Sequence, residues 1–309
     1  TRWSFNGGNV PMSELMNESH ERVGALLIEA LPYIQQFAGK TVVVKYGGNA
    51  LAGASDADAA GTFAQDIALM HAVGIKPVVV HGGGPQISAL MERLGKKPEF
   101  RNGLRVTDAE TVEIASMVLL GTVNPQLVSA INVHGASAIG VSGQDAGLLR
   151  VTQRDPELGF VGDIASVDPT VLKSAIADNA VPVVATIGSD ASGQAYNVNA
   201  DTAAAAIAVA LGAEKLIYLT DIEGLRANKD DAASIIRRTT ASEIARLMAS
   251  GSIDGGMIPK MESCVDAITS GVSRCHILDG RIPHVLLIEL FTIAGVGTMI
   301  TADQEVGKK

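Results

Sequence analysis

Aromatic residues and positive charge are both scarce in this sequence, and each scarcity excludes a class of protein. Aromatic residues make up 4% of the 309 residues, which argues against the stacking platforms that bind single-stranded nucleic acid. The formal net charge is −9, and an acidic protein repels nucleic acid and anionic membranes unless a local basic patch compensates. The sequence contains no such patch, so we expect no nucleic-acid partner.

Cysteines and long apolar runs are also few. The two cysteines, Cys264 and Cys275, are too few for a disulfide framework or a zinc site, and we expect both to be small core residues. The longest apolar run, Ala203 to Leu211, has about half the length that a membrane-spanning helix needs. No signal peptide precedes the first expected helix, and Met12 is the expected native start. We therefore expect a cytoplasmic protein with no membrane segment.

What the sequence has in abundance is apolar residues and glycine. Hydrophobic residues make up 47% and charged residues 18%, and there are 33 glycines, a composition that suits a sheet covered by helices on both faces. Strands at 41–45 and 77–80 alternate with helices at 56–74 and 85–95. This βαβα order predicts an α/β fold with a mainly parallel sheet and right-handed crossovers.

The remaining pattern predicts further elements and three regions. A helix over 13–37 precedes the first strand, and Pro32 should kink or restart it. We expect the following elements after residue 98: a hairpin at 99–107, a capping box from Thr107, a β-rich excursion at 138–167 that could carry a lid, strands at 181–187 and 216–220, and helices from Asp201, at 240–250 and at 259–270. The regions are an N-terminal extension (1–38), an N-terminal lobe (39–190) and a C-terminal lobe (191–309).

Two glycine-rich turns are the most informative feature. Val42-Val43-Val44-Lys45-Tyr46-Gly47-Gly48-Asn49 and Val78-Val79-Val80-His81-Gly82-Gly83-Gly84-Pro85 each join an apolar strand to a helix. Glycine lets the backbone approach an anion closely, and the first amides of the following helix point at the ligand. Neither turn fits the Walker A or the dinucleotide fingerprint, so any phosphate site here is of another kind.

Three further segments place polar groups where a strand ends or a helix begins, which is where open α/β sheets bind ligands. They are Asn197-Val198-Asn199-Ala200-Asp201, Leu219-Thr220-Asp221-Ile222-Glu223-Gly224-Leu225 and Gly255-Gly256-Met257-Ile258-Pro259-Lys260. Taken singly, Lys45, Lys260 and Arg105 would be ordinary surface charges, and Asp201 an ordinary helix N-cap. We interpret His81 as structural, hydrogen-bonded to its glycine loop.

Taken together, these motifs resemble the amino-acid kinase family, and within it the N-acetylglutamate kinases. The resemblance covers roughly residues 40 to 301 and includes Gly103-Leu104-Arg105-Val106-Thr107. The stretch from Asp279 to Thr298 and the helix before the first strand are similar to the arginine-inhibited branch of these kinases. One departure is Gly121-Thr122-Val123-Asn124-Pro125, where the family usually has Gly-Lys-Val-Asn-Lys, which puts a local ion pair or subunit contact in doubt.

The resemblance implies a three-layer αβα fold and ATP-dependent phosphorylation of the side-chain carboxylate of N-acetyl-L-glutamate in arginine biosynthesis. A carboxylate with a pKa of about 4.3 is already ionised at neutral pH, so the reaction needs positive charge rather than a general base. By the resemblance, Lys45 and Lys260 stabilise the transferring phosphoryl group, and Asp201 orients both. The implied substrate contacts are Gly83, Gly84, Arg105 and Asn197, and the implied nucleotide contacts are Gly47, Gly48, Thr220, Asp221 and Gly224. Mg²⁺ would arrive with ATP, without a protein metal ligand.

Regulation and assembly are also implied by the resemblance alone. L-Arginine would be an allosteric inhibitor, with Lys215, His284, Glu289 and Gly295 as its contacts. The apolar stripe from Val23 to Phe37 would link three dimers into a hexamer, or it would pack on its own subunit. Two alternatives to the kinase activity stay open: an amino-acid kinase acting on aspartate, glutamate, carbamate or a nucleoside monophosphate, and a non-catalytic arginine sensor or scaffold.

Overall fold

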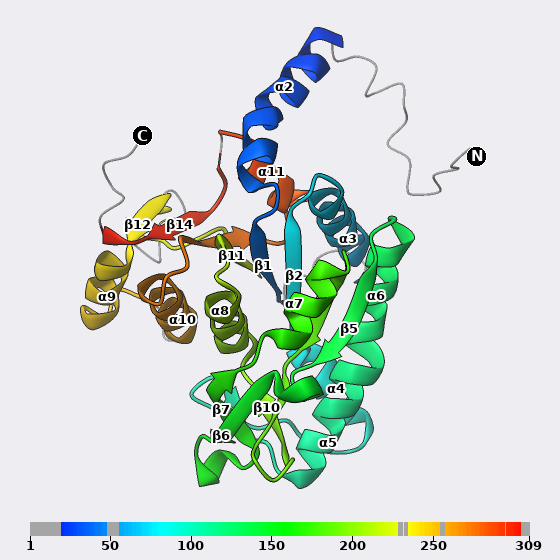
Figure 1. Cartoon of the computed structure of the whole chain (residues 1–309). Helices are drawn as coiled ribbons and strands as arrows, with labels where there is room; N and C mark the ends of the chain where they lie inside the picture. Colours follow the sequence, from blue (N-terminus) through cyan, green and yellow to red (C-terminus); the bar gives the residue numbers. More distant parts are fainter. Residues whose placement is uncertain are drawn as a thin grey trace.

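A central sheet crosses the molecule and carries the candidate site at one edge (Figure 1). The computed structural model describes residues 20–47, 56–227, 231, 234–253, 257–293 and 295–303. In this part of the chain the sheet has eight strands in the order β12-β14-β13-β11-β1-β2-β8-β5. Their bounds are β1 Thr41–Tyr46, β2 Lys76–His81, β5 Ala138–Ser142, β8 Val181–Ala185, β11 Lys215–Thr220, β12 Arg238–Thr240, β13 Arg274–Asp279 and β14 Thr298–Thr301. Neighbouring strands are parallel except β13 and β14, so the expected mainly parallel sheet is confirmed.

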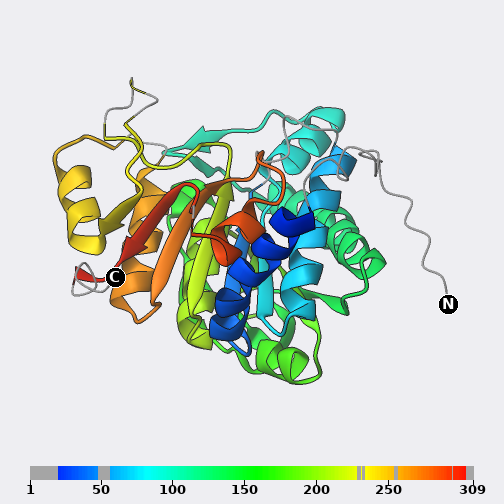
Figure 2. The same ribbon diagram turned by 90° about the horizontal axis from the view of Figure 1, so that it is seen from above.

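Helices cover both faces of this sheet, because successive side chains of a buried strand point to opposite sides. Val42 and Val44 of β1 belong to one core cluster, and Val43 belongs to the other. The first cluster packs under α2, α3, α4, α5, α6 and α11, and the second under α7, α8, α9 and α10. Figure 2 shows α2 and α11 crossing one face of the sheet. The predicted three-layer arrangement is therefore confirmed.

The helices have the following bounds: α2 His20–Phe37, α3 Asp56–Ala72, α4 Gly84–Arg93, α5 Ala109–Val118, α6 Asn124–Val133, α7 Thr170–Ala177, α8 Ala200–Leu211, α9 Ala241–Ala249, α10 Ile258–Thr269 and α11 Val285–Phe291. Of the two effects expected at Pro32, the restart is wrong, since α2 continues through this residue, and the kink stays a prediction. The expected capping box at Thr107 is also wrong by one position. Asp108 caps α5 by accepting from the Thr111 amide at 2.8 Å, while the Thr107 backbone pairs with Leu158 and Phe160.

A small closed barrel stands beside the sheet and forms one wall of the candidate site. Its strands are β6 Leu149–Gln153, β7 Val161–Val167, β9 Ile187–Ser189 and β10 Ala195–Val198. The expected β-rich excursion is confirmed for β6 and β7, but β5, at its start, belongs to the main sheet. The expected hairpin is present as β3 Phe100–Arg101 and β4 Leu104–Arg105. The predicted lobe boundary near residue 190 falls in the turn between the paired strands β9 and β10, so it would divide the barrel between the two lobes, and the division into lobes stays a prediction.

The continuous helix Ala109–Val133 joins α5, a π-helical turn at Leu119–Val123, and α6. By length and composition alone it could cross a membrane, which the length of the uninterrupted apolar runs does not predict. Ile114, Leu119 and Ile131 of this helix are buried in the first core cluster. These three residues therefore pack against the rest of the chain, whereas Met117 and Val133 of the same helix are 56% and 76% exposed.

Candidate active site

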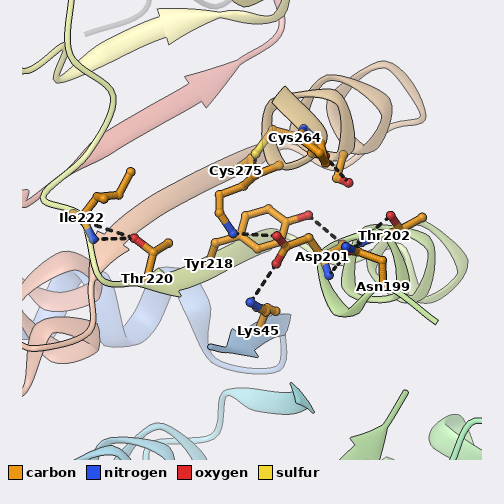
Figure 3. A network of polar contacts seen from close by, with 12 residues as sticks. Lys45, Asn199, Asp201, Thr202, Tyr218, Thr220, Ile222, Cys264 and Cys275 are labelled. Atoms are coloured by element: carbon orange, nitrogen blue, oxygen red, sulfur yellow. Dashed lines mark hydrogen bonds and ion pairs between the residues drawn. The ribbon is translucent and has the colours of Figure 1, made fainter. Parts of the chain in front are cut away.

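Asp201 lies between the ammonium groups of Lys45 and Lys260. Its Oδ1 is 2.9 Å from Lys45 Nζ, and its Oδ2 accepts a hydrogen bond of 2.7 Å from Lys260 Nζ. Lys45 comes from the end of β1, Asp201 from the first turn of α8, and Lys260 from the first turn of α10. Figure 3 shows the Asp201 carboxylate directed at Lys45. Three segments that are distant in sequence thus bring two positive charges and one negative charge together.

The charges of this cluster are fixed by its burial and its composition. Burial alone would raise the pKa of Asp201, but Lys45 and then Lys260 outweigh burial and hold this pKa well below its usual range. Burial lowers the pKa of Lys45, and the Asp201 carboxylate opposes that shift. Asp201 therefore stays ionised across the physiological pH range, which leaves the cluster one net positive charge when both lysines are protonated.

Asp201 does not cap its own helix, contrary to the simplest interpretation of the sequence. The cap of α8 is Asn199, whose Oδ1 accepts from the amides of Asp201 at 2.8 Å and Thr202 at 3.1 Å. Because Asn199 satisfies these amides, the Asp201 carboxylate is available to the lysines. Tyr218 of β11 supports the arrangement: its hydroxyl donates to the Asp201 carbonyl at 3.0 Å, and its ring centroid lies 4.9 Å from Lys260 Nζ.

Two glycines, Gly47 and Gly83, border the cluster where a Cβ would meet a neighbouring atom at 2.6 Å. A Cβ on Gly47 would lie 2.6 Å from the Leu219 carbonyl oxygen, and a Cβ on Gly83 would lie 2.6 Å from Leu119 Cδ2. Gly84, the first residue of α4, has open space around the same position. The N-terminus of α4 therefore faces the candidate site with backbone amides that have no partner within their own helix.

Arg105 is a buried cation without an acidic partner among the described residues. It is 6% exposed, and its Nη2 donates to the Gly84 carbonyl and to Ser88 Oγ, both at 2.8 Å. Its guanidinium carbon lies 4.7 Å from the Phe100 ring centroid. Burial lowers its pKa from the ordinary value. A desolvated guanidinium of this kind is suited to an anionic ligand that would balance its charge.

One cavity of about 210 Å³ connects these features. Six of the expected site residues line it: Lys45, Gly83, Gly84, Arg105, Asn197 and Asp201. Lys260 is joined to the cavity through Asp201. The barrel strands β7 and β10 contribute Val161 and Val198 to the wall, and Thr186 lines it from between β8 and β9. The cavity therefore combines the start of α4, the lysine–aspartate cluster and a buried arginine without an acidic partner among the described residues, a combination suited to an anionic ligand.

The sequence of this chain is similar to those of known kinases. A family model described as the amino acid kinase family matches residues 40–279. The chain belongs to the amino acid kinase family. It is 53% identical over 285 residues to the acetylglutamate kinase of Symbiobacterium thermophilum, covering 89% of this chain and 96% of the relative. It is 48% identical over 308 residues to the acetylglutamate kinase of Paenarthrobacter aurescens, and the match covers 94% of this chain and 96% of the relative.

Solved structures of this family agree on the fold. The N-acetylglutamate synthase of Neisseria gonorrhoeae, in complex with coenzyme A and N-acetyl-glutamate, is similar with a TM-score of 0.79 and 28% identity. The match covers 91% of this chain and 63% of the synthase chain. The carbamate kinase of Giardia lamblia bound to AMP-PNP is similar at 22% identity with a TM-score of 0.66, and the match covers 86% of this chain and 99% of the carbamate kinase chain. Because the family model matches and relatives about 50% identical are named acetylglutamate kinase, this chain is a kinase of the amino acid kinase family.

The expected nucleotide contacts of this kinase do not line the cavity. Thr220 is the last residue of β11 and Asp221 follows it, at the same sheet edge as Lys45. Burial lowers the pKa of Lys45, and the Asp221 charge opposes that shift more weakly than Asp201 does. Thr220 Oγ1 accepts from the Ile222 amide at 2.9 Å and so shapes the loop (Figure 3). Gly224 is buried, at a φ of 145° that favours glycine. Gly48 lies outside the described residues. The structure thus leaves the nucleotide role of these residues a prediction.

The sequence does not predict the roles of two residues of the site. Asn199 and Asp201 are equally good N-caps by residue type, and Tyr218 has the pattern of an ordinary core strand residue. The contact between the two cysteines was also missed: both are buried core residues, as predicted, and their Sγ atoms lie 3.0 Å apart beside Tyr218 (Figure 3). Among the described residues no group of three or more His, Cys, Asp or Glu side chains could hold a metal ion.

Two of the four expected effector residues line a second cavity. Glu289 and Gly295 line a second cavity of about 260 Å³ together with Arg237 and Arg238. Glu289 Oε1 is 2.8 Å from His276 Nδ1, and its Oε2 accepts from the Val296 amide at 2.8 Å.

The other two expected effector residues do not line this second cavity. Lys215 is buried beside the Phe37 ring, and burial lowers its pKa to about 8 although the Glu289 charge opposes the shift. His284 precedes α11, and its Nδ1 lies 2.6 Å from Asp66 Oδ1 of α3.

Proposed function

We propose that this kinase transfers the γ-phosphoryl group of ATP to the side-chain carboxylate of N-acetyl-L-glutamate, as a step of arginine biosynthesis. The observation that carries the proposal is Arg105, a buried guanidinium without an acidic partner among the described residues, in the same cavity as the Lys45–Asp201–Lys260 cluster. The names of the relatives, acetylglutamate kinases about 50% identical to this chain, support the choice of acceptor.

The arrangement suits a dicarboxylate acceptor. Arg105 would bind the α-carboxylate through its guanidinium, and Asn197 would hydrogen-bond the main-chain part of the substrate. The side-chain carboxylate would then point toward the α4 amides and Lys45. No base is required, because this carboxylate is already ionised at neutral pH.

Phosphoryl transfer then depends on positioning and positive charge. A carboxylate oxygen forms a bond to the γ-phosphorus while the bond from that phosphorus to the β,γ-bridging oxygen breaks, giving an acyl phosphate and ADP. Lys45 and Lys260 would stabilise the equatorial oxygens, and the amides of Gly83 and Gly84 would bind oxygens of the acceptor or of the phosphoryl group. Mg²⁺ carried by the nucleotide would neutralise phosphate charge on the Thr220 side.

The experiment is ATP-dependent acyl-phosphate formation, trapped as hydroxamate, with N-acetyl-L-glutamate, free glutamate, aspartate and carbamate as acceptors. The proposal predicts product with the acetylated substrate and at least ten times less with the others, since an unpaired polar group strongly disfavours a wrong substrate. Equal product with another acceptor would favour a different amino-acid kinase. No product with any acceptor would favour a sensor or scaffold.

We also propose that L-arginine inhibits the enzyme through the Glu289 cavity. Glu289 offers a carboxylate to a guanidinium, and Arg237 and Arg238 offer positive charge to an α-carboxylate at the same cavity. A similar protein, the N-acetylglutamate synthase of Neisseria gonorrhoeae, was crystallised with L-arginine. Glu289→Gln should raise the arginine concentration for half-inhibition at least tenfold, whereas Glu243→Gln on the exposed side of α9 should not. Unchanged inhibition of the Glu289 variant would contradict this assignment.

The proposed assembly is a hexamer in which α2 joins dimers. Leu27 and Ile28 of α2 are each 69% exposed, while Phe37 at its end is buried against the sheet. An apolar stripe on an otherwise solvent-facing helix is suited to a second copy of the same helix. Deletion of residues 1–30 should lower the mass measured by light scattering, and an unchanged hexamer would contradict this use of α2.

A further inference from the structure

His81 is a buried histidine that carboxylate phosphorylation does not use, and it directly precedes the glycine loop of the site. Its Nδ1 lies 2.9 Å from the Gly82 carbonyl oxygen, and its Nε2 lies 3.0 Å from Asn124 Nδ2. A carbonyl oxygen can only accept, so Nδ1 carries the ring proton and donates it to this bond. Nε2 is then the acceptor of a hydrogen bond from the Asn124 amide.

The orientation of the Asn124 amide is fixed by two neighbouring strands. Its Nδ2 also donates to the Val183 carbonyl of β8 at 2.8 Å, which requires the nitrogen rather than the oxygen to face the sheet. Val183 is paired with Gly140 of β5, where a Cβ would lie 2.1 Å from Asn124 Oδ1. Glycine at this position thus leaves room for the amide oxygen, while the amide nitrogen is held by its two hydrogen bonds.

A π-helical turn places Asn124 where it can reach His81. The backbone N–H of Asn124 donates to the Leu119 carbonyl, five residues earlier. Pro125 has no N–H that could donate to the carbonyl of Gly121. Leu119 begins the turn, and its Cδ2 lies against Gly83. One turn of helix therefore contacts the glycine loop twice, directly through Leu119 and indirectly through Asn124 and His81.

These contacts determine the direction of a backbone donor in the site. The peptide between Gly82 and Gly83 is trans, so its C=O and N–H point in opposite directions. Fixing the Gly82 carbonyl on His81 therefore fixes the Gly83 N–H, and Gly83 lines the cavity beside Lys45. Without this bond, a peptide flanked by glycines could rotate at little steric cost.

We propose that Asn124 is a positioning residue for phosphoryl transfer: it holds His81 in the Nδ1–H tautomer, which fixes the Gly83 amide toward the reacting oxygens. This inference rests on the proposed function. Burial lowers the pKa of His81 to about 4, so the ring is neutral at working pH and its single proton can serve only one of the two nitrogens. Because the Asn124 side chain donates to Nε2, that nitrogen is the acceptor and the ring proton stays on Nδ1.

The first test is the tautomer of His81 in the intact wild-type protein, read from its ring ¹⁵N chemical shifts. The proposal predicts a neutral ring with the proton on Nδ1 from pH 6 to 8. A proton on Nε2, or a ring that exchanges between tautomers, would overturn it. This measurement needs no substrate, so it remains decisive even if N-acetyl-L-glutamate proves not to be the acceptor.

The second test is kinetic and uses a matched asparagine of the same helix. Asn124→Leu removes both donated bonds, whereas Asn132→Leu removes bonds to Ala138 of β5, away from the cavity. We expect kcat of the Asn124 variant to fall about tenfold or more, since one misplaced oxyanion donor costs up to roughly 10²–10³, with the two KM values changed less than threefold. The Asn132 variant should keep wild-type kcat. Equal kcat in the two variants would overturn the proposal.

A second pair of variants covers the case in which Asn124→Leu does not fold. An asparagine at position 81 can place its amide nitrogen near the position of Nδ1, whereas a glutamine places it near Nε2. His81→Asn should therefore retain most of the wild-type kcat, and His81→Gln should lose about tenfold, as expected for a donor that is moved rather than deleted. The reverse order, or equal rates, would contradict positioning through the Gly82 carbonyl.

Discussion

Lys45 Nζ lies 2.9 Å from Asp201 Oδ1, an ion pair that joins the end of β1 to the first turn of α8. Lys260 shares the other oxygen of the same carboxylate, at 2.7 Å. The carboxylate thus keeps two like charges close together without neutralising both. Positive charge that is fixed before substrate binds is what transfer between two anions requires.

Replacing Asp201 by asparagine should reduce kcat by about 10² or more, because the neutral amide no longer orients two ammonium groups. The same change leaves two buried lysines without a counter-ion and should destabilise the fold by about 3 kcal/mol. Steady-state kinetics and urea unfolding measure both effects. Asp163→Asn, in an exposed ion pair with Arg154, is the control and should change neither quantity measurably. A kcat within threefold of wild type for the Asp201 variant would contradict an orienting role.

Arg105→Lys should raise the KM of the acceptor by roughly ten- to a hundredfold, with a smaller effect on kcat and on the KM of ATP, because an ammonium cannot form the two parallel bonds of a guanidinium. The matched control is Arg101→Lys on the partner strand of the hairpin, where the side chain is exposed and pairs with Glu157. Initial rates measured over a range of acceptor concentrations give the acceptor KM of each variant. An acceptor KM that is equal in the two variants would remove Arg105 from the substrate site.

The fold was largely predictable from sequence because its signals are local. Each of the strands β1 and β2 is an apolar run closed by glycine, and the alternation with helices determines the parallel sheet. The antiparallel strand β14 and the pairing of β5 with the main sheet were not predictable, since they depend on contacts between residues far apart in the chain. The same reason applies to the corrected cap at Asp108: the backbone pairing of Thr107 with the loop before β7 is a long-range contact.

The site was predictable only as a set of residue types. Asp201 and Asn199 are both good N-caps, and no local rule says which of them is released to bind lysines; the structure assigns the cap to Asn199. The predicted hydrogen bond of His81 to its glycine loop is confirmed, but its second partner, Asn124, and the polar partners of Arg105 come from other segments, so the burial of both side chains could not be seen in the sequence. For Arg105 this changes the interpretation from an ordinary surface charge to a buried cation in a cavity.

His81 should make the stability of the protein depend on pH. Burial lowers its pKa from 6.5 to about 4, so between these values the unfolded chain binds a proton that the folded state does not. The stability that neutral His81 contributes is therefore fully present above pH 6.5. As the pH falls from 6.5 to 4, the free energy of unfolding decreases by about 3 kcal/mol. Urea unfolding of wild type and His81→Asn at a series of pH values measures the difference. A wild-type curve parallel to that of the variant between pH 4 and 6.5 would show that His81 is not buried as a neutral ring.

The measurement that tests the account most directly is the single-turnover rate of γ-phosphoryl transfer from ATP to N-acetyl-L-glutamate in three lysine variants. Lys45→Met and Lys260→Met each remove one of the charges that Asp201 holds, and Lys96→Met removes a lysine paired with Asp108 and Glu110 outside the cavity. We predict that the first two lower the rate by about 10² or more and that the third leaves it unchanged within twofold. A wild-type rate in either cavity variant would contradict the central claim that the Lys45–Asp201–Lys260 cluster carries the phosphoryl transfer.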